Sequence, residues 1–214
     1  MRGGRGLQPV QPKDSIPPWG THRNAAGAAR RLCRSQAGGL RGGRGKGTTA
    51  RHVGRHLDDW KVPMPDGRHW TVERDGSVTA PPAEVVSPVC RYEDIEMVQE
   101  VVRAIRAAGA KADGSCGIHI HIHIGLGEHT IEFHAFNGTL HAGEIKAYIQ
   151  LCLAISAQAL STKAASSTRP VTDNPKYTFR CWLLRLGFIG DEFSTAREHL
   201  LKKLPGNAAW RQAS

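Results

Sequence analysis

Three histidines at alternate positions are the residues best suited to chemistry in this sequence. His119, His121 and His123 lie in the run from Cys116 to Ile124, where each histidine is followed by an isoleucine. On a β-strand, alternate side chains lie on opposite faces, so the isoleucines would enter the core and the imidazoles would share the other face. Imidazoles can ligate a divalent metal or donate hydrogen bonds to phosphate oxygens. The alternative is a polar outer face, but Lys, Glu or Thr would serve there, so the pattern favours a function, chiefly for His119 and His121.

A second candidate segment runs from Thr130 to His134 and places Glu132 and His134 on one face of a predicted strand. A carboxylate beside imidazoles can hold Mg²⁺ or Mn²⁺, the ions that neutralise the phosphates of ATP. Glu84, on a separate predicted strand, could add a ligand. For either glutamate the alternative is a solvated residue on an exposed face. His141, just before a predicted helix, is more typical of a capping or surface residue.

The elements that must position these residues are predicted from hydrophobic periodicity. Alternation around the turn at residues 65–67 predicts a hairpin from Trp60 to Val72, and shorter runs predict strands at 84–86, 118–124 and 130–133. Helical spacing of apolar residues predicts four helices. The first begins at residue 95 and stops at Gly109, and the others span residues 143–160, 177–186 and 191–204. Antiparallel strands with interleaved helices predict an α+β fold.

The basic charge of the chain is concentrated at one end. The formal net charge of the 214 residues is +10, and residues 1–55 hold twelve of the 29 Lys and Arg but one of the 19 acidic residues. The remainder therefore has 17 basic and 18 acidic residues. This near-neutral balance is typical of an ordinary globular domain and argues against a nucleic-acid or membrane surface.

Residues 1–47 differ in composition from residues 48–214, which we interpret as one domain. The first segment holds eleven of the 24 glycines and has no sustained period, so we predict a disordered basic tail. Its Arg-Gly steps could bind nucleic acid or serve as a targeting segment, and a wrong reading frame in GC-rich DNA would give the same composition. We favour the wrong-frame interpretation because aromatic residues, which stack on bases, are nearly absent there.

The cysteines and the hydropathy pattern bear on location. Five cysteines are scattered without a Cys-x-x-Cys pair, which favours a reducing cytosol over a disulfide framework or a zinc ribbon. The N-terminal arginines are not followed by the apolar run of a secretory signal. No segment approaches the ~20 apolar residues that span a bilayer. We therefore expect a cytoplasmic protein without a membrane partner.

Several motifs follow one another in an order that is characteristic of one family. They are Glu84-Val85-Val86-Ser87-Pro88, Ser115-Cys116-Gly117-Ile118-His119-Ile120-His121, Thr130-Ile131-Glu132-Phe133, Phe136 to Gly143 and Tyr177 to Phe193. In this order they resemble the amidoligase family of ATP-dependent carboxylate–amine ligases, over nearly all of residues 56–214.

The resemblance implies a fold and a reaction. The family is similar to glutamine synthetase and glutamate–cysteine ligase, which implies a curved, mainly antiparallel sheet with helices packed behind it. It also implies that ATP phosphorylates a carboxylate and that an amine then displaces phosphate to form an amide. ATP and Mg²⁺ or Mn²⁺ would be the cofactors, and carboxylate and amine substrates, peptides among them, would be the partners.

The resemblance further implies roles for individual residues. Glu84, His119 and Glu132 would bind the metal, and His121 would contact the γ-phosphate. The predicted catalytic residues are Glu132, His121 and His134, and the predicted cofactor-binding residues are His121, Ser77 and His134. A metal ion and such donors would stabilise the charge of the transferring phosphoryl group, which is mostly electrostatic work.

The sequence departs from the usual family pattern at three places. Residues 1–55 contain no Glu, although family members usually open with a metal-binding Glu-x-Glu strand. His134 stands where an arginine is usual, and an imidazole cannot form a bidentate fork with phosphate. A long helical insertion usually separates the two strands that only residues 122–129 separate here. We therefore expect a truncated ligase that is weakly active or inactive.

Two other functions are left open by the sequence. One is a non-catalytic metal-binding protein that uses the row of histidines at 119, 121 and 123. The other is a nucleic-acid-binding protein that acts through residues 1–47.

Overall fold

The computed structural model describes residues 19–22, 51–52, 60–73, 75, 83–124 and 129–210, the first two ranges as backbone alone. The chain divides into two compact units. We call Pro17–Ile145 the sheet unit, and we call the unit that includes Lys146–Ser214 the helical unit. The boundary falls in the first turn of a helix.

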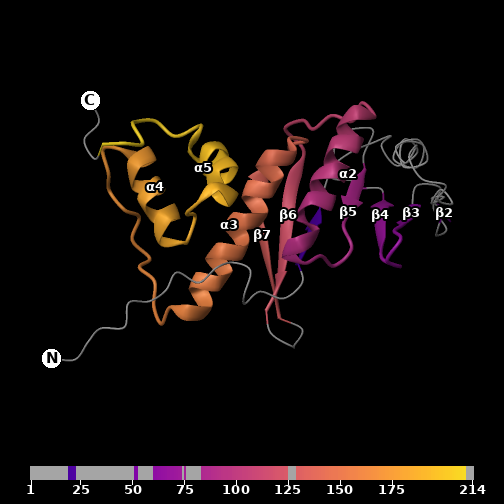
Figure 1. Cartoon of the computed structure of the whole chain (residues 1–214), viewed down its shortest axis with the longest axis horizontal. Helices are drawn as coiled ribbons and strands as arrows, with labels where there is room; N and C mark the ends of the chain where they lie inside the picture. Colours follow the sequence, from indigo (N-terminus) through magenta and orange to yellow (C-terminus); the bar gives the residue numbers. More distant parts are fainter. Residues whose placement is uncertain are drawn as a thin grey trace. The chain divides into compact units, whose positions relative to one another are not determined.

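The sheet unit is built on one antiparallel sheet with the strand order β2-β3-β4-β5-β1-β6-β7 (Figure 1). Every pair of neighbouring strands is antiparallel, and β2 and β7 form the two edges, so the sheet is open. The predicted α+β class and the antiparallel sheet are confirmed. The strands are β1 (Trp19–His22), β2 (Arg51–His52), β3 (Trp60–Pro63), β4 (His69–Glu73), β5 (Glu84–Val86), β6 (Gly117–His123) and β7 (Thr130–Asn137).

The predicted hairpin is formed by β3 and β4. Its turn places Gly67 at a φ of 87°, a left-handed conformation that glycine adopts without steric cost. Buried Val62 pairs with buried Trp70 across the two strands. Next to the turn, the two Nη nitrogens of Arg68 donate to the Asp94 carboxylate, at 2.7 and 2.8 Å, which joins the hairpin to the residue before the next helix.

That helix, α2 (Ile95–Ala107), follows the short 3₁₀ helix η1 (Tyr92–Asp94). Its apolar residues recur at helical spacing and are buried, and they are Ile95, Val98, Val101, Val102 and Ile105. Gly109, at a φ of 87°, follows the helix as the sequence predicts. Gln99 donates a hydrogen bond of 3.1 Å to the Ala142 carbonyl, which ties α2 to the first residue of α3.

β1 lies in the middle of the sheet, between β5 and β6, although it belongs to the segment predicted to be disordered. Gly20 pairs with His121 and His22 pairs with His119. A strand that the sequence analysis did not identify therefore borders the histidine strand. The other residues of 1–47 lie outside the described ranges, where the prediction of a tail stays a prediction.

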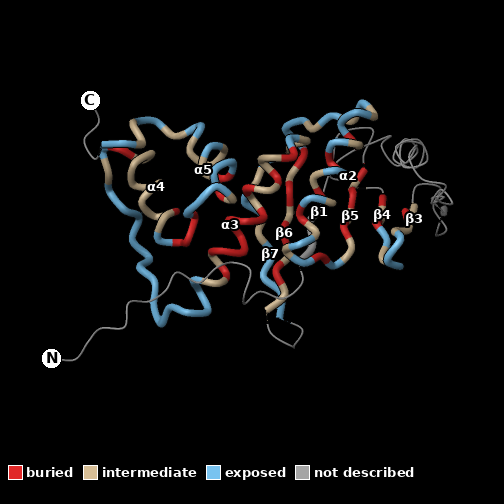
Figure 2. Tube along the Cα trace, in the orientation of Figure 1, coloured by how far each residue is buried: buried red, intermediate tan, exposed pale blue. Residues whose placement is uncertain are grey.

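The two strands that carry the candidate site residues, β6 and β7, differ in burial (Figure 2). Along β6 the pattern is strict: Ile118, Ile120 and Ile122 are buried, and the histidines between them are half-buried. β7 is an edge strand, and six of its eight residues are exposed. The predicted division of β6 into an isoleucine face and a histidine face is confirmed.

The helical unit contains most of α3 (Ala142–Ser161), then α4 (Pro175–Arg185), the 3₁₀ helix η2 (Asp191–Phe193) and α5 (Ser194–Leu201). The predicted last helix is thus shorter and begins as a 3₁₀ turn. Fully buried Asn174 caps α4: its Oδ1 accepts from the Tyr177 and Asn207 amides, and its Nδ2 donates to the Trp210 carbonyl. None of the helices in the described ranges is long and apolar enough to cross a membrane.

Candidate metal centre

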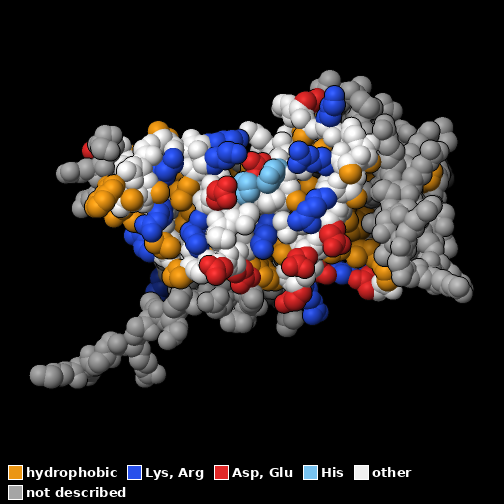
Figure 3. Space-filling view, turned by 45° about the horizontal axis from the view of Figure 1, so that its top comes forward, with side chains coloured by type: hydrophobic (Ala, Val, Ile, Leu, Met, Phe, Trp, Pro, Cys, Tyr) orange, Lys and Arg blue, Asp and Glu red, His pale blue; other side chains and the backbone are white. Residues whose placement is uncertain are grey.

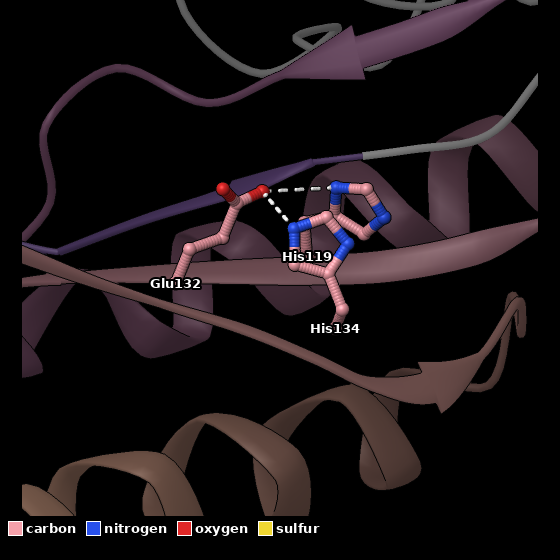
Figure 4. Close-up of side chains that lie close together, drawn as sticks. All are labelled: His119, Glu132 and His134. Carbon is pink, nitrogen blue, oxygen red and sulfur yellow. Dashed lines mark ion pairs between the residues drawn. The ribbon is translucent and has the colours of Figure 1, made fainter.

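Three imidazoles converge on one carboxylate oxygen of the sheet unit. The Oε1 atom of Glu132 lies 2.7 Å from Nε2 of His134, 3.1 Å from Nε2 of His121 and 3.2 Å from Nδ1 of His119. Figure 4 shows the rings of His119 and His134 directed toward the same end of the carboxylate. Because a carboxylate oxygen has two lone pairs, it cannot accept an ideal hydrogen bond from all three nitrogens at once. The arrangement is better suited to a cation shared by these groups.

Strand register explains why these side chains meet. His121 lies directly opposite Glu132 in the antiparallel pair of β6 and β7, where opposite Cβ atoms are about 4.5–5.5 Å apart. Beyond that pair the register shifts between Ile118 and Ile120. Ile120 pairs with Phe133 and Ile118 pairs with Phe136, so two residues of β7, His134 and Ala135, lie opposite His119 alone. This is a β-bulge.

The bulge has a direct consequence for the site. Phe133 and Phe136 are three residues apart, a spacing that would place them on opposite faces of a regular strand. The extra residue keeps both opposite the buried isoleucines and leaves His134 beside His119. The ring centroids of His119 and His134 are 3.8 Å apart. The donor atoms of His119, Glu132 and His134 all lie within 4.8 Å of one another.

The electrostatics of the cluster favour an ionised glutamate. Partial desolvation by itself raises the pKa of Glu132, but the hydrogen bond from His134 and the charges of His121, His134 and His119 outweigh it, so the pKa is lowered. The carboxylate is therefore anionic at neutral pH. Exposure rises from His119, whose side chain is 16% exposed, to Glu132 at 38% and His134 at 58%, so the cluster opens to solvent at β7.

The donor set fits a metal ion. Two imidazole nitrogens and one carboxylate oxygen are ligands that divalent metals use in proteins, commonly with open positions left for water or substrate. His121 contacts the carboxylate and is not part of the three-residue donor group. Its contact would hold the Glu132 carboxylate in orientation, as groups behind a metal ligand commonly do.

Of the predicted metal ligands, the structure brings together His119 and Glu132 but not Glu84. Val86 pairs with His22, which pairs with His119, so Glu84, two residues before Val86, shares the histidine face. β1 nevertheless separates β5 from β6, and two strand spacings amount to about 10 Å. Glu84 is not a member of the donor group found among the described residues.

The other residues predicted for the site differ in whether they belong to the donor group. His134, predicted as a catalytic and nucleotide-binding residue, belongs to the donor group. His123 lies on the same face but is paired with Thr130, whose Oγ1 is 3.3 Å from its Nδ1. His141 accepts a hydrogen bond from the Glu144 amide at 3.3 Å and so caps α3. Ser77 lies outside the described residues.

One acidic residue on this face was missed by the sequence analysis. Glu73, on β4, lies directly opposite Glu84, and both are half-buried. The two carboxylates share the histidine face of the sheet. Like charges at directly opposite positions are unfavourable. The signal available in the sequence was that the alternation of the hairpin continues to Glu73.

Comparison with known families identifies the lineage. A family model described as "Putative amidoligase enzyme" matches residues 28–128 and 123–156, more than half of the chain. The protein belongs to this amidoligase family. The match begins earlier than the predicted resemblance at residue 56 and ends at residue 156. Its two segments overlap at residues 123–128, which follow the histidines at 119 and 121 of β6 and precede β7. No curated protein and no solved structure matches the chain.

Proposed function

We propose that the protein is an ATP-dependent carboxylate–amine ligase with weak activity. In this reaction the substrate carboxylate attacks the γ-phosphorus of ATP, which yields an acyl phosphate and releases ADP. An amine then attacks the acyl carbon, loses a proton and displaces inorganic phosphate, which leaves an amide. A divalent ion, Mg²⁺ or Mn²⁺, would neutralise phosphate charge in the transfer.

The observation that carries this proposal is the convergence of His119, His121 and His134 on Glu132. The cluster joins two motifs of the family, on β6 and β7, at the half-exposed face of the sheet. An ionised carboxylate surrounded by imidazoles can bind a cation and direct N–H donors at phosphate oxygens. Family membership supports this reaction, and the cluster is the position that we propose for its cation.

Each side chain has a proposed task. His119 and Glu132 would ligate the ion, and His121 would hold the Glu132 carboxylate and donate to the transferring phosphoryl group. His134 would contribute a nitrogen at the solvent-exposed side, and Ser77 would contact the nucleotide. Glu84 lies two strands from the histidines, about 10 Å or more across β1, so it would act only on an ion separate from the one held by His119 and Glu132.

Weak activity is proposed because parts of the usual site are absent. β1 borders the histidine strand, and its sequence, Trp-Gly-Thr-His, contains no carboxylate to ligate an ion. His134 replaces the arginine that would grip phosphate bidentately. The sheet would be an incomplete form of the curved, glutamine synthetase-like sheet, and the protein would act in the cytoplasm on small carboxylates, amines or peptides.

Nucleic acid is not proposed as a partner of the described region. Lys and Arg side chains are interspersed with Asp and Glu on the face drawn in Figure 3. Binding to a phosphate backbone depends on the neutralisation of many phosphates by clustered basic residues. The idea of nucleic-acid binding through residues 1–47 falls outside the described ranges and stays a prediction.

A second candidate function is non-catalytic metal binding. It is favoured by the compactness of the donor group of His119, Glu132 and His134, which needs no nucleotide to be complete. This function would use His134 rather than the predicted His123, whose ring is paired with Thr130.

Calorimetric titration of the full chain with Mg-ATP tests the proposal. We expect weak binding by the wild type, loss of binding in His121→Ala, and wild-type binding in His123→Ala, the matched control on the same face of β6. Formation of ADP in the presence of a carboxylate and an amine would establish turnover. Absence of nucleotide binding by a wild-type protein that still binds Zn²⁺ would exclude the ligase and favour the second function.

A further inference from the structure

We propose that His134 makes this centre selective for a transition-metal ion of the Zn²⁺ class, bound by His119, His134 and Glu132, over Mg²⁺. The proposal rests on the cation site of the proposed function and specifies which ion that site prefers. It concerns binding and does not require that the protein turn over ATP.

The first step is the composition of the donor group. Among the described residues, the compact group contains two imidazoles and one carboxylate. Mg²⁺ demands oxygen ligands in near-octahedral geometry and keeps several waters, whereas imidazole suits Zn²⁺, Ni²⁺, Cu²⁺ and Fe²⁺. Glu84 and Glu73, which could supply oxygens, lie two and three strands from β6. A nitrogen-rich group with a single carboxylate therefore favours the transition ion.

The second step is geometric fit. Zn²⁺ bonds to nitrogen and oxygen at about 2.0–2.2 Å, so tetrahedral ligands lie roughly 3.4 Å apart. Oε1 of Glu132 is 3.2 Å from His119 and 2.7 Å from His134. A small rotation of the exposed His134 side chain would open the shorter distance enough to admit the ion. The remaining coordination position would face solvent on the side of β7.

A β-bulge in β7 brings His134 into the site. The bulge places His134 and Ala135 together opposite His119 and allows the two imidazoles to lie 3.8 Å apart. Bulges re-aim side chains and are frequent beside functional sites. His121, 3.1 Å from Glu132, orients the carboxylate, a contact that commonly contributes to metal affinity. The backbone feature and the side-chain contacts therefore support the same ion site.

The test is a calorimetric titration of the full chain with metal ions in the absence of nucleotide, with His134→Gln as the main variant. The glutamine keeps a polar side chain at a 58% exposed position, so folding should be retained, and the circular dichroism melting curve verifies this. We expect Zn²⁺ to occupy one site from which a roughly thousandfold excess of Mg²⁺ does not displace it. His134→Gln removes a direct ligand, so it should weaken Zn²⁺ binding by at least the roughly 10–100-fold that loss of a group behind a ligand costs, and leave Mg²⁺ binding unchanged.

Two controls make the result specific. His123→Gln removes an imidazole from the same face of β6 and should leave Zn²⁺ affinity unchanged, which excludes diffuse binding by the chain's histidines. Displacement of Zn²⁺ by Mg²⁺, or equal Zn²⁺ affinity of His134→Gln and wild type, would overturn the proposal. Zn²⁺ selectivity without Mg-ATP binding would support the Zn²⁺ site and exclude the proposed ligase function. Mg-ATP binding without Zn²⁺ selectivity would support the ligase function and overturn the Zn²⁺ site.

Discussion

β6 and β7 form one candidate site but specify it by different means. On β6 the isoleucines are buried and fix which way the histidines face. β7 is an exposed edge strand, and a bulge sets the position of His134. Hence one strand contributes half-buried imidazoles, and the other contributes solvent-exposed ligands. The comparison teaches that truncation of the buried face of β6 should cost more stability than truncation on β7, while both strands supply ligands.

Paired truncations in the two strands give the largest expected effect. Ile120 is fully buried, so Ile120→Ala should lower the free energy of unfolding by about 2–5 kcal/mol. Ile131 on β7 is 41% exposed, so Ile131→Ala should cost about 0.5 kcal/mol or less. Urea unfolding of both variants measures the difference. Equal costs would show that β7 is as much a part of the core as β6.

Removal of the central charge should affect binding rather than folding. Glu132→Gln keeps the shape of the side chain but removes the anion that three imidazoles face. Because Glu132 is a proposed direct ligand, Zn²⁺ affinity should fall by at least the roughly 10–100-fold that loss of a group behind a ligand costs. Calorimetric titration measures the loss. Glu100→Gln, at an exposed position of α2, is the control and should bind as the wild type does. Unchanged affinity in Glu132→Gln would remove Glu132 from the site.

The lowered pKa of Glu132 predicts a pH dependence of stability without metal. A carboxyl group whose folded-state pKa is depressed contributes stability that is fully present above its unfolded-state pKa, near 4.5. That contribution is lost as the pH falls through the lower folded-state pKa. In EDTA, the wild type should therefore lose stability more steeply below pH 4.5 than Glu132→Gln, as followed by urea unfolding. Parallel curves would mean that the imidazoles do not stabilise the carboxylate.

The smallest effect is expected at Gly117, at the start of β6. A Cβ atom there would lie 3.5 Å from Nε2 of His119, an ordinary van der Waals contact. Gly117→Ala should therefore leave metal affinity unchanged and raise the free energy of unfolding by up to about 1 kcal/mol, since glycine weakens a strand. Thermal melting and metal titration measure both. A tenfold loss of affinity would show that the His119 ring needs this space.

The sequence predicts β6 well because alternation and burial coincide there. The isoleucine–histidine period is strict over seven residues, and the isoleucines are buried as that period predicts. The hairpin at Gly67 and helix α2 were predictable for the same reason, since a turn residue or a helical period specified each.

β7 and β1 were less predictable for physical reasons. The period-2 pattern of β7 continues to Ala135 and breaks at Phe136. Whether such a break ends the strand or forms a bulge depends on the partner strand, which the local sequence does not contain. β1 has only four residues and lies in a glycine- and arginine-rich segment, so its own sequence shows no strand pattern. Its formation depends on pairing with β5 and β6. Glu84 was predicted as a further metal ligand, but the intervening β1, which the sequence analysis did not identify, sets its distance from the histidines.

The central claim is that His119 and His134, from two strands, share one cation. It is tested most directly by long-range ¹H–¹⁵N correlation spectra of the imidazoles during a Zn²⁺ titration of the full chain. The account predicts that the ring resonances of His119 and His134 shift together. Their shifts should be complete at one equivalent of Zn²⁺ and should occur before any shift of the His123 resonances. Independent shifts with different apparent affinities, or a first response at His123, would contradict it.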